Sequence, residues 1–227
     1  MKRLAFFVEG QGDFHAVPNL VGTLASQHPD FFTHLFIDDK PFIIGGPEQF
    51  SGKKQAEWNR YLKLAKTRPK LGAVLAIFDG DSHKFEGEPF CAAAAARVLA
   101  EWAKVEGAGV QFSLAVVFVR QEYESLLIAA GRQIPDLPPE IELPDAPDDA
   151  PRGAKEWWAK HLSGGYDPTR DQKRLTNAVV DWQPVATASR SFRRVMSAMA
   201  ELTTAVATDS HISTPGIPSV APVPQGI

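Results

Sequence analysis

The stretch Leu71–His83, LGAVLAIFDGDSH, predicts a buried strand that ends in two aspartates. The apolar run Val74–Phe78 is typical of a central strand that is covered on both faces. Sites in open α/β sheets lie beyond the carboxyl ends of the strands, where Asp79 and Asp81 would stand. Carboxylate oxygens there suit Mg²⁺ or Mn²⁺, although Asp-Gly is also ordinary turn chemistry.

A second apolar run, Leu4–Val8, also ends at an acid, in the segment Glu9-Gly10-Gln11-Gly12-Asp13. An acid after one strand and D-x-D after another is the smallest constellation expected of a metal-dependent phosphoryl-transfer site. The spacing predicts a helix over Phe14–His28, and we expect Asp13 to be its N-cap rather than a metal ligand.

A third strand, Val110–Val119, runs into a helix that opens with Glu122 and Glu124. Glutamates in a first helical turn are also stabilised by the helix dipole, so they need not be ligands. The alternation of strands and helices along the chain predicts an α/β fold with a mainly parallel sheet that is flanked by helices.

Between these strands, Phe31–Ile44 reads as a hairpin, or as one short strand with a turn. Helices are predicted at Lys53–Arg68 and at Phe90–Val105. We expect Cys91 to pack against the core as a small apolar residue.

The chain divides by composition into four segments. Residues 1–132 form the predicted α/β core, and residues 133–151, with six prolines and six acids, form an extended acidic surface loop. Residues 152–202 carry nine Lys or Arg against five Asp or Glu and form a small basic helical extension packed on the core. Residues 203–227 are expected to be a flexible tail.

Composition limits the classes of function. The net charge of −3 gives no global basic field of the kind that coats DNA. The single cysteine excludes an internal disulfide framework and a cysteine-rich zinc site, which fits the cytoplasm. The N-terminal apolar run is too short for a signal peptide or a membrane span, and no P-loop motif is present.

The last predicted helix begins at Ser189 or Ser191 and carries Arg190, Arg193 and Arg194 in its first turn. Positive side chains oppose the helix dipole there, as expected if this end binds an anion such as phosphate. Surface solubility explains the same arginines equally well.

Six pieces of the chain, in order, resemble the DUF4276 family, which is related to the TOPRIM domain of topoisomerases, primases and OLD-family nucleases. The resemblance covers residues 3–202. The pieces are V-E-G-Q-G-D at Val8–Asp13, D-G-D at Asp79–Asp81, E-Y-E-S-L-L-I-A-A at Glu122–Ala130, G-A-K-E-W-W at Gly153–Trp158, Y-D-P-T-R-D-Q at Tyr166–Gln172 and S-R-S-F-R-R at Ser189–Arg194.

This resemblance implies a TOPRIM-like fold in which Glu9, Asp79 and Asp81 hold one or two Mg²⁺ ions and Glu9 acts in proton transfer. Glu124 matches a further acid of the family. Ser125-Leu126 departs from the usual Ala-Trp there, and Ala130 replaces an Asp, so the resemblance supports Glu124 less than the other three. The resemblance also places Lys155, Lys173 and Arg193 among the candidates for phosphate contacts.

The sequence thus predicts a Mg²⁺- or Mn²⁺-dependent nuclease acting on DNA or RNA, with binding that weakens steeply with salt. The resemblance suggests a bacterial defence effector that an ATPase partner accompanies. Two alternatives stay open: a non-catalytic partner-binding module, and a phosphohydrolase of a small nucleotide. Three converging acids argue against the binding module, because an idle site does not need them.

Overall fold

A parallel sheet forms the centre of the molecule in a computed structural model that describes residues 1–28, 30–144, 146–149 and 153–216. Its strand order is β2-β1-β4-β7-β8, and β3 also pairs with β1; all of these pairs are parallel. The predicted mainly parallel α/β fold is therefore confirmed. The strands are β1 (Lys2–Val8), β2 (Leu35–Ile37), β3 (Phe42–Ile43), β4 (Leu71–Asp79), β7 (Ser113–Val119) and β8 (Ser213–Thr214).

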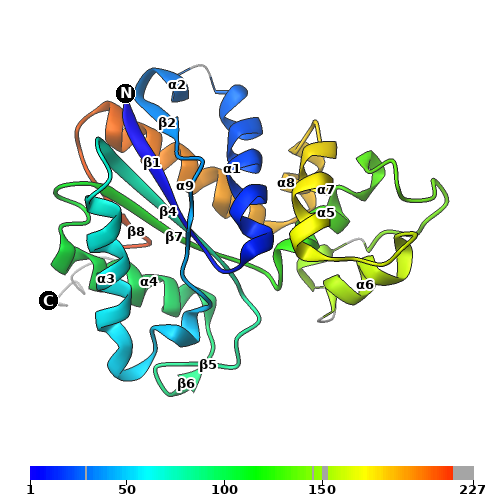
Figure 1. Ribbon diagram of the computed structural model, residues 1–227, viewed down its shortest axis with the longest axis horizontal. Coiled ribbons are helices and arrows are strands. Elements are labelled where there is room, and N and C mark those ends of the chain that lie inside the picture. Colours follow the sequence, from blue (N-terminus) through cyan, green and yellow to red (C-terminus); the bar gives the residue numbers. More distant parts are fainter. Residues whose placement is uncertain (29, 145, 150–152, 217–227) are drawn as a thin grey trace, which may run out of the picture.

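Helices cover both faces of the sheet (Figure 1). One face packs against α1 and α9 and the other against α3 and α4, because alternate residues of β1, β4 and β7 enter two separate apolar clusters. A small antiparallel hairpin, β5 (Lys84–Phe85) and β6 (Glu88–Pro89), follows β4. The helices are α1 (Gln11–Ser26), α2 (Phe31–His34), α3 (Gln55–Lys66), α4 (Ala92–Ala103), α5 (Tyr123–Ala129), α6 (Ala154–His161), α7 (Lys173–Ala178), α8 (Gln183–Ala188) and α9 (Arg190–Ala207).

Between β1 and β4 the chain crosses from one face of the sheet to the other. From β1, the chain passes through α1 on one face to β2, then through α3 on the opposite face to β4, which lies on the other side of β1. The carboxyl ends of β1 and β4 therefore form a topological switch point, the place where open α/β sheets bind ligands.

The helices α5 to α8 lie beside the sheet rather than on it (Figure 1). Trp158 of α6, Leu175 of α7 and Trp182, which directly precedes α8, are fully buried in the same cluster as α1 and one face of the sheet. A π-helical turn, Pro168–Gln172, leads into α7 and contacts α1. This packing holds the basic segment against the end of the sheet where β1 and β4 finish.

Several local predictions are wrong. Residues 31–44 form no hairpin, since β2 and β3 both run parallel to β1. Cys91 is exposed rather than packed in the core, because it precedes α4 as its N-cap residue. The predicted acidic surface loop buries Ile134 and Leu137 in the core.

The expected flexible tail is also wrong over residues 203–216. The apolar stripe of α9 continues to Ala205, and Ser213 and Thr214 then pair with Leu114 and Ala115 of β7. Residues 217–227 lie outside the described part of the chain. The predicted N-cap is confirmed: the Ser189 hydroxyl accepts a hydrogen bond from the N–H of Phe192 at 3.0 Å.

Candidate functional site

Two carboxylates meet where β1 and β4 end. Glu9 directly follows β1, and Asp79 is the last residue of β4. The backbone N–H of Asp79 donates a hydrogen bond to Oε2 of Glu9 at 3.1 Å. The structure therefore brings Glu9 and Asp79 together, as expected for acids at the carboxyl ends of neighbouring parallel strands.

The glycine between the two aspartates has a specific packing role. The N–H of Gly80 donates to the carbonyls of Val119 and Gln121, both at 2.8 Å, and so ties the turn to the end of β7. A Cβ at position 80 would lie 2.8 Å from the Val119 carbonyl oxygen, so any other residue there would force the backbone to shift. The D-G-D motif thus needs glycine for close backbone approach.

The backbone of α5 fixes the orientation of Asp79. The N–H of Tyr123, the first residue of α5, donates to Oδ1 of Asp79 at 2.8 Å. The first N–H groups of a helix have no partner within it, so the carboxylate satisfies one of them. Asp79 is held this way with its side chain 17% exposed.

Lys155, at the start of α6, places its ammonium group among three carboxylates. Its Nζ lies 2.8 Å from Glu122, 3.6 Å from Asp79 and 3.7 Å from Glu124. Burial alone would lower the pKa of Lys155, but Glu124, Asp79 and Glu122 outweigh burial and raise it. Lys155, predicted as a phosphate contact, is thus a permanent cation inside the acidic group.

Glu124 is buried beneath this lysine. It is 1% exposed, and its Oε1 accepts a hydrogen bond from the Tyr166 hydroxyl at 2.8 Å. Burial and the neighbouring Glu124 carboxylate raise the pKa of Tyr166, so its hydroxyl stays protonated and donates. Burial also raises the pKa of Glu124 itself. With Lys155 and Tyr166 as partners, Glu124 has less capacity than Glu9 for a further ligand.

Asp13 lies behind the strand ends and is not the N-cap of α1. Gly10 is the N-cap, and Asp13 accepts hydrogen bonds from the Gly10 N–H at 3.0 Å and from the Gln172 amide at 2.6 Å. Helix α1 begins three residues earlier than predicted, at Gln11. At Gly12 a Cβ would overlap the Gln172 amide, which explains the second glycine of the V-E-G-Q-G-D segment.

The acids of the site are electrostatically strained. Burial raises the pKa of Glu9 to about 7, opposed by its hydrogen bond from Asp79 and assisted by repulsion from Glu48, Asp13 and Asp81. Burial, together with the charges of Asp13, Glu124 and Glu9, also raises the pKa of Asp79. The site therefore holds more acids than the Lys155 ammonium group neutralises.

The carboxylate oxygens of these acids are the kind of ligand that a hard divalent cation takes, although they do not surround one completely. Within residues 1–28, 30–144, 146–149 and 153–216, no group of three or more His, Cys, Asp or Glu is arranged to hold a metal ion. Mg²⁺ usually keeps several waters and takes only one or two carboxylates together with substrate phosphates. Glu9 and Asp79 supply such a pair, and Asp81 follows directly.

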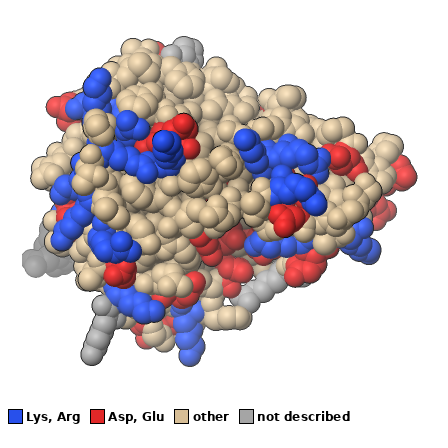
Figure 2. All heavy atoms as spheres, viewed as in Figure 1, with Lys and Arg blue, Asp and Glu red and all other residues tan. Residues whose placement is uncertain are grey.

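The other predicted phosphate contacts lie apart from these acids. Arg193 is engaged by α8, since its guanidinium donates to the carbonyls of Ala186 at 2.6 Å and Thr187 at 3.1 Å. Lys173 and Arg190 are exposed. In Figure 2, acidic side chains gather in the middle of the face, and a group of basic side chains lies over the region of α7.

The amino end of α9 already has an anion. Asp148, from the acidic loop, accepts hydrogen bonds from the Ser191 N–H at 2.9 Å and from the Ser189 hydroxyl at 2.6 Å. An internal carboxylate at a helix N-terminus satisfies the same free N–H groups that a bound phosphate would use. The arginines around Arg190 therefore surround a helix end that the chain itself caps.

Sequence reasoning missed Glu48 and Tyr166 as members of the site, and it named Glu122 only as an acid at the start of the helix after the third strand. Glu48 lies in a 3₁₀ turn, Pro47–Gln49, shortly after β3, and repels Glu9. Its signal was an acid after yet another parallel strand, but that strand is only two residues long. Gly46 permits the approach, because a Cβ there would lie 2.8 Å from Oε1 of Glu9.

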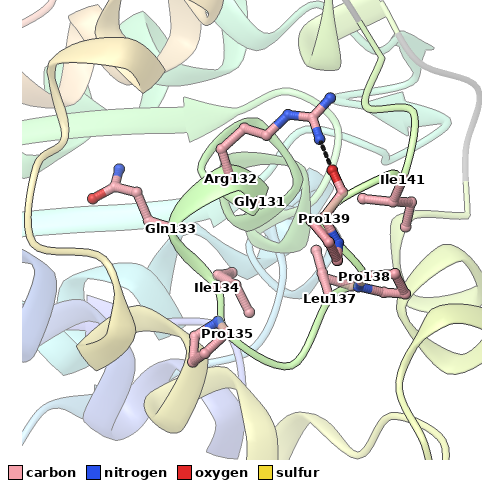
Figure 3. A pocket seen from close by; sticks show the side chains of 9 residues that line it. All are labelled: Gly131, Arg132, Gln133, Ile134, Pro135, Leu137, Pro138, Pro139 and Ile141. Carbon is pink, nitrogen blue, oxygen red and sulfur yellow. Dashed lines mark hydrogen bonds between the residues drawn. The ribbon is translucent and has the colours of Figure 1, made fainter.

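Two of the cavities on the described surface differ in whether they reach the site. The larger, about 510 Å³, lies within the segment from Gly131 to Ile141, where Arg132 donates to the carbonyl of Pro139 (Figure 3). Its walls contain none of the predicted site residues. The smaller, about 410 Å³, includes Gly80 and therefore begins at the D-G-D turn.

Comparison with known proteins adds the family. No significant match was found among curated proteins or among solved structures. No helix in the described part of the chain is both long and apolar enough to cross a bilayer. The model of DUF4276, a domain of unknown function, matches residues 8–200. Since that match spans most of the chain and includes every acid of the site, this protein belongs to the DUF4276 family.

Proposed function

We propose that this protein is a TOPRIM-like, Mg²⁺- or Mn²⁺-dependent phosphodiesterase of the cytoplasm that acts on nucleic acid. The observation that carries the proposal is the pair Glu9 and Asp79, joined by a hydrogen bond at the switch point of a parallel sheet. The order of acids, with Glu9 after β1 and Asp79 and Asp81 after β4, supports the relationship to TOPRIM.

Glu9 and Asp79 would hold the cation, with Asp81 beside them. A bound divalent ion supplies charge that polarises a phosphate and lowers the pKa of a coordinated water. Glu9, with its pKa raised to about 7 by burial and by neighbouring acids, is suited to accept a proton near neutral pH. Tyr123 keeps Asp79 oriented through its backbone N–H.

Lys155 has a positioning role in this proposal. Its ammonium group bridges Asp79, Glu122 and Glu124, and so keeps the acids close without metal. The lysine side chain as a whole is 39% exposed, and we expect its ammonium group to contact a phosphate oxygen as well. Lys173 and Arg190, exposed on the helical extension, would contact the nucleic-acid backbone further from the acids.

The test is calorimetric titration of Mg²⁺ and Mn²⁺ into the wild type and into the double variant Asp79→Ala/Asp81→Ala. Cleavage of plasmid, single-stranded DNA, RNA and nucleotides is scored in parallel. We expect metal binding and cleavage to be lost together in the double variant. Glu101→Gln, which removes an exposed acid that forms an ion pair with Lys104, is the matched control and keeps both.

The other outcomes separate the alternatives. Metal binding without cleavage of any substrate would indicate that a partner, such as an ATPase, is required for activity. Cleavage of nucleotides alone would replace the polymer by a small substrate. If the wild type binds neither Mg²⁺ nor Mn²⁺, the enzyme proposal fails and a partner-binding module takes its place.

A further inference from the structure

The cavity of about 410 Å³ lies directly beside the proposed catalytic acids. Its walls come from three parts of the chain. These are the connection after β4, the residues just before α4, and the end of β7 with the connection that follows it. They contribute Gly80 and Ser82, then Phe90 and Cys91, then Phe118 and Gln121. Small-molecule pockets measure about 300–1,000 Å³, so this space suits one ring system and not a duplex.

One wall of the cavity is aromatic. The ring of Phe118 lies 5.4 Å from that of Phe90, in an edge-to-face arrangement, and 5.4 Å from that of Phe78 behind it. Phe118 is 7% exposed and Phe90 is half-buried, so both rings are held in place. Fixed aromatic rings of this kind are platforms on which nucleobases stack.

A second wall carries an amide with an unused acceptor. The Oε1 atom of Gln121 is buried and has no hydrogen-bond partner within the described residues. Buried acceptors without partners are rare in folded proteins, so a small rotation of this side chain toward the cavity would let a ligand donate to the Oε1 atom. A glutamine amide matches adenine in particular, since it accepts from N6 and donates to N7.

The third wall is the amino end of α4, a helix of 12 residues. Its N-cap residue Cys91 provides no side-chain hydrogen bond, and its first turn contains no acid. The free N–H groups of such a helix end attract phosphate. Arg120, which also lines the cavity, adds a positive charge to its surroundings.

We propose that this cavity binds one unpaired adenine nucleotide unit, with the base against Phe118 and its amino group donating to Gln121. The phosphate would then lie between the amino end of α4 and the acids at Asp79 and Asp81. This inference rests on the proposed function and specifies its substrate: an unpaired adenine next to the phosphate that is cleaved. The unit can come from a free nucleotide or from a single strand.

The only cysteine of the chain lines the cavity and is exposed, which gives a direct probe of occupancy. Alkylation of Cys91 by a maleimide is followed in EDTA, so that neither metal binding nor cleavage contributes. The ligands are AMP, UMP, oligo(dA) and a duplex of oligo(dA) with oligo(dT). We expect AMP, oligo(dA) or both to slow alkylation, and UMP and the duplex to have little effect.

Gln121→Met keeps the size of the side chain and removes its amide. We expect it to weaken protection by the adenine ligand by about 10- to 100-fold, the range of one bidentate base contact. Gln111→Met, on an exposed loop elsewhere, is the matched control and should leave protection unchanged. The ligand that protects, AMP or oligo(dA), identifies the source of the nucleotide.

The inference is overturned if no adenine ligand protects Cys91, if UMP protects equally, if the duplex protects as well as the single strand, or if Gln121→Met has no effect. Its failure is distinct from failure of the proposed function. Protection without metal binding or cleavage by the wild type would leave a nucleotide site on a protein that is not this enzyme. Cleavage without protection would leave the enzyme and remove the adenine site.

Discussion

Two consecutive residues of the π-helical turn, Asp171 and Gln172, belong to two carboxylate clusters that differ in how their charge is balanced. Asp171 is 2% exposed and accepts hydrogen bonds from Arg170 at 2.6 Å and Arg174 at 3.1 Å. Burial alone would raise the pKa of Asp171, but these arginines and the Asp167 N–H lower it to about 2. The next residue, Gln172, donates to Asp13, which belongs to the second cluster with the acids around Asp79.

The second cluster has the opposite balance. The pKa values of Glu9, Asp13, Asp79 and Glu124 are all raised, with burial as the first cause, and Lys155 is the ammonium group among them. Salt bridges that serve the fold lower the pKa of their acids, whereas acids kept short of cations are characteristic of sites. The candidate site is therefore marked by its deficit of positive charge rather than by the number of its acids.

Removing the Lys155 cation from the second cluster should give the largest change in the free energy of unfolding. In Lys155→Met, Asp79, Glu122 and Glu124 lose their shared partner and repel one another. We expect the free energy of unfolding at pH 8 in EDTA to fall by about 2–3 kcal/mol. This is less than the full 3–5 kcal/mol of a buried pair, because the lysine is 39% exposed. Chemical denaturation measures it.

Lys155→Arg is the control, since it keeps the charge and should recover most of the stability. Mg²⁺ should stabilise Lys155→Met by more than it stabilises the wild type, because the variant has a larger deficit of positive charge. An unchanged free energy of unfolding in Lys155→Met would mean that the acids are not compressed as described.

Neutralising Glu9 should stabilise the protein, whereas Lys155→Met should destabilise it. Its folded pKa of about 7 lies above its unfolded value of 4.5, so ionisation of Glu9 opposes folding. That cost is absent below about pH 4.5 and complete above about pH 7. Glu9→Gln, which can still accept from the Asp79 N–H, should therefore raise the free energy of unfolding by about 1–2 kcal/mol at pH 8 in EDTA and have no effect at pH 4.5.

The same variant tests metal binding through stability. A ligand that binds only the folded state stabilises it by mass action, so Mg²⁺ should raise the melting temperature of the wild type and barely that of Glu9→Gln. Destabilisation by Glu9→Gln at pH 8 would contradict the charge deficit. Glu142→Gln, an exposed acid of the 133–151 loop, is a suitable control at both pH values.

Much of this contrast was predictable from the sequence, because local signals define the strands and their last residues. The apolar runs of β1, β4 and β7, each followed by acids, were enough to predict the sheet and the meeting of Glu9 with Asp79. A parallel sheet aligns its carboxyl ends whatever the connections between strands, so long-range placement followed from local pattern.

The rest depended on packing between distant segments. Lys155 reaches Asp79 only because α6 packs beside α5 through Trp158, whose indole donates to the Glu124 carbonyl at 3.2 Å. No local pattern encodes that contact across some thirty residues. Glu48 was missed because β3 is two residues long, and β8 because a strand of two residues carries no periodicity.

A smaller change in the free energy of unfolding is expected in the first cluster, where arginines balance the charge of Asp171. In the folded protein the pKa of Asp171 is about 2, below its unfolded value of 3.8, so its ionisation favours folding. This contribution is complete above about pH 4 and is lost as the pH falls through 2. Asp171→Asn should lower the free energy of unfolding by about 1 kcal/mol at pH 7, because two exposed arginines lose a charged acceptor.

The pH dependence distinguishes this variant from Glu9→Gln. The difference between Asp171→Asn and the wild type should shrink toward zero between pH 4 and pH 2, whereas that of Glu9→Gln grows from pH 4.5 to pH 7. Metal affinity should not change in Asp171→Asn, since its carboxylate faces Arg170 and Arg174. Loss of Mg²⁺ binding in this variant would mean that the two clusters are not separate.

The smallest change in stability is expected at an ion pair on the solvent-exposed surface. Glu57 and Arg60 of α3 form a pair at 2.9 Å with both side chains about half exposed. Water screens such a pair and its side chains lose freedom on pairing, so it contributes little. Glu57→Gln should leave the melting temperature and the metal titration unchanged at every pH tested. A measurable shift there would mean that the changes in stability at Glu9 and Asp171 reflect the net charge of the protein and not the surroundings of each acid. The contrast between the two clusters would then lose its basis.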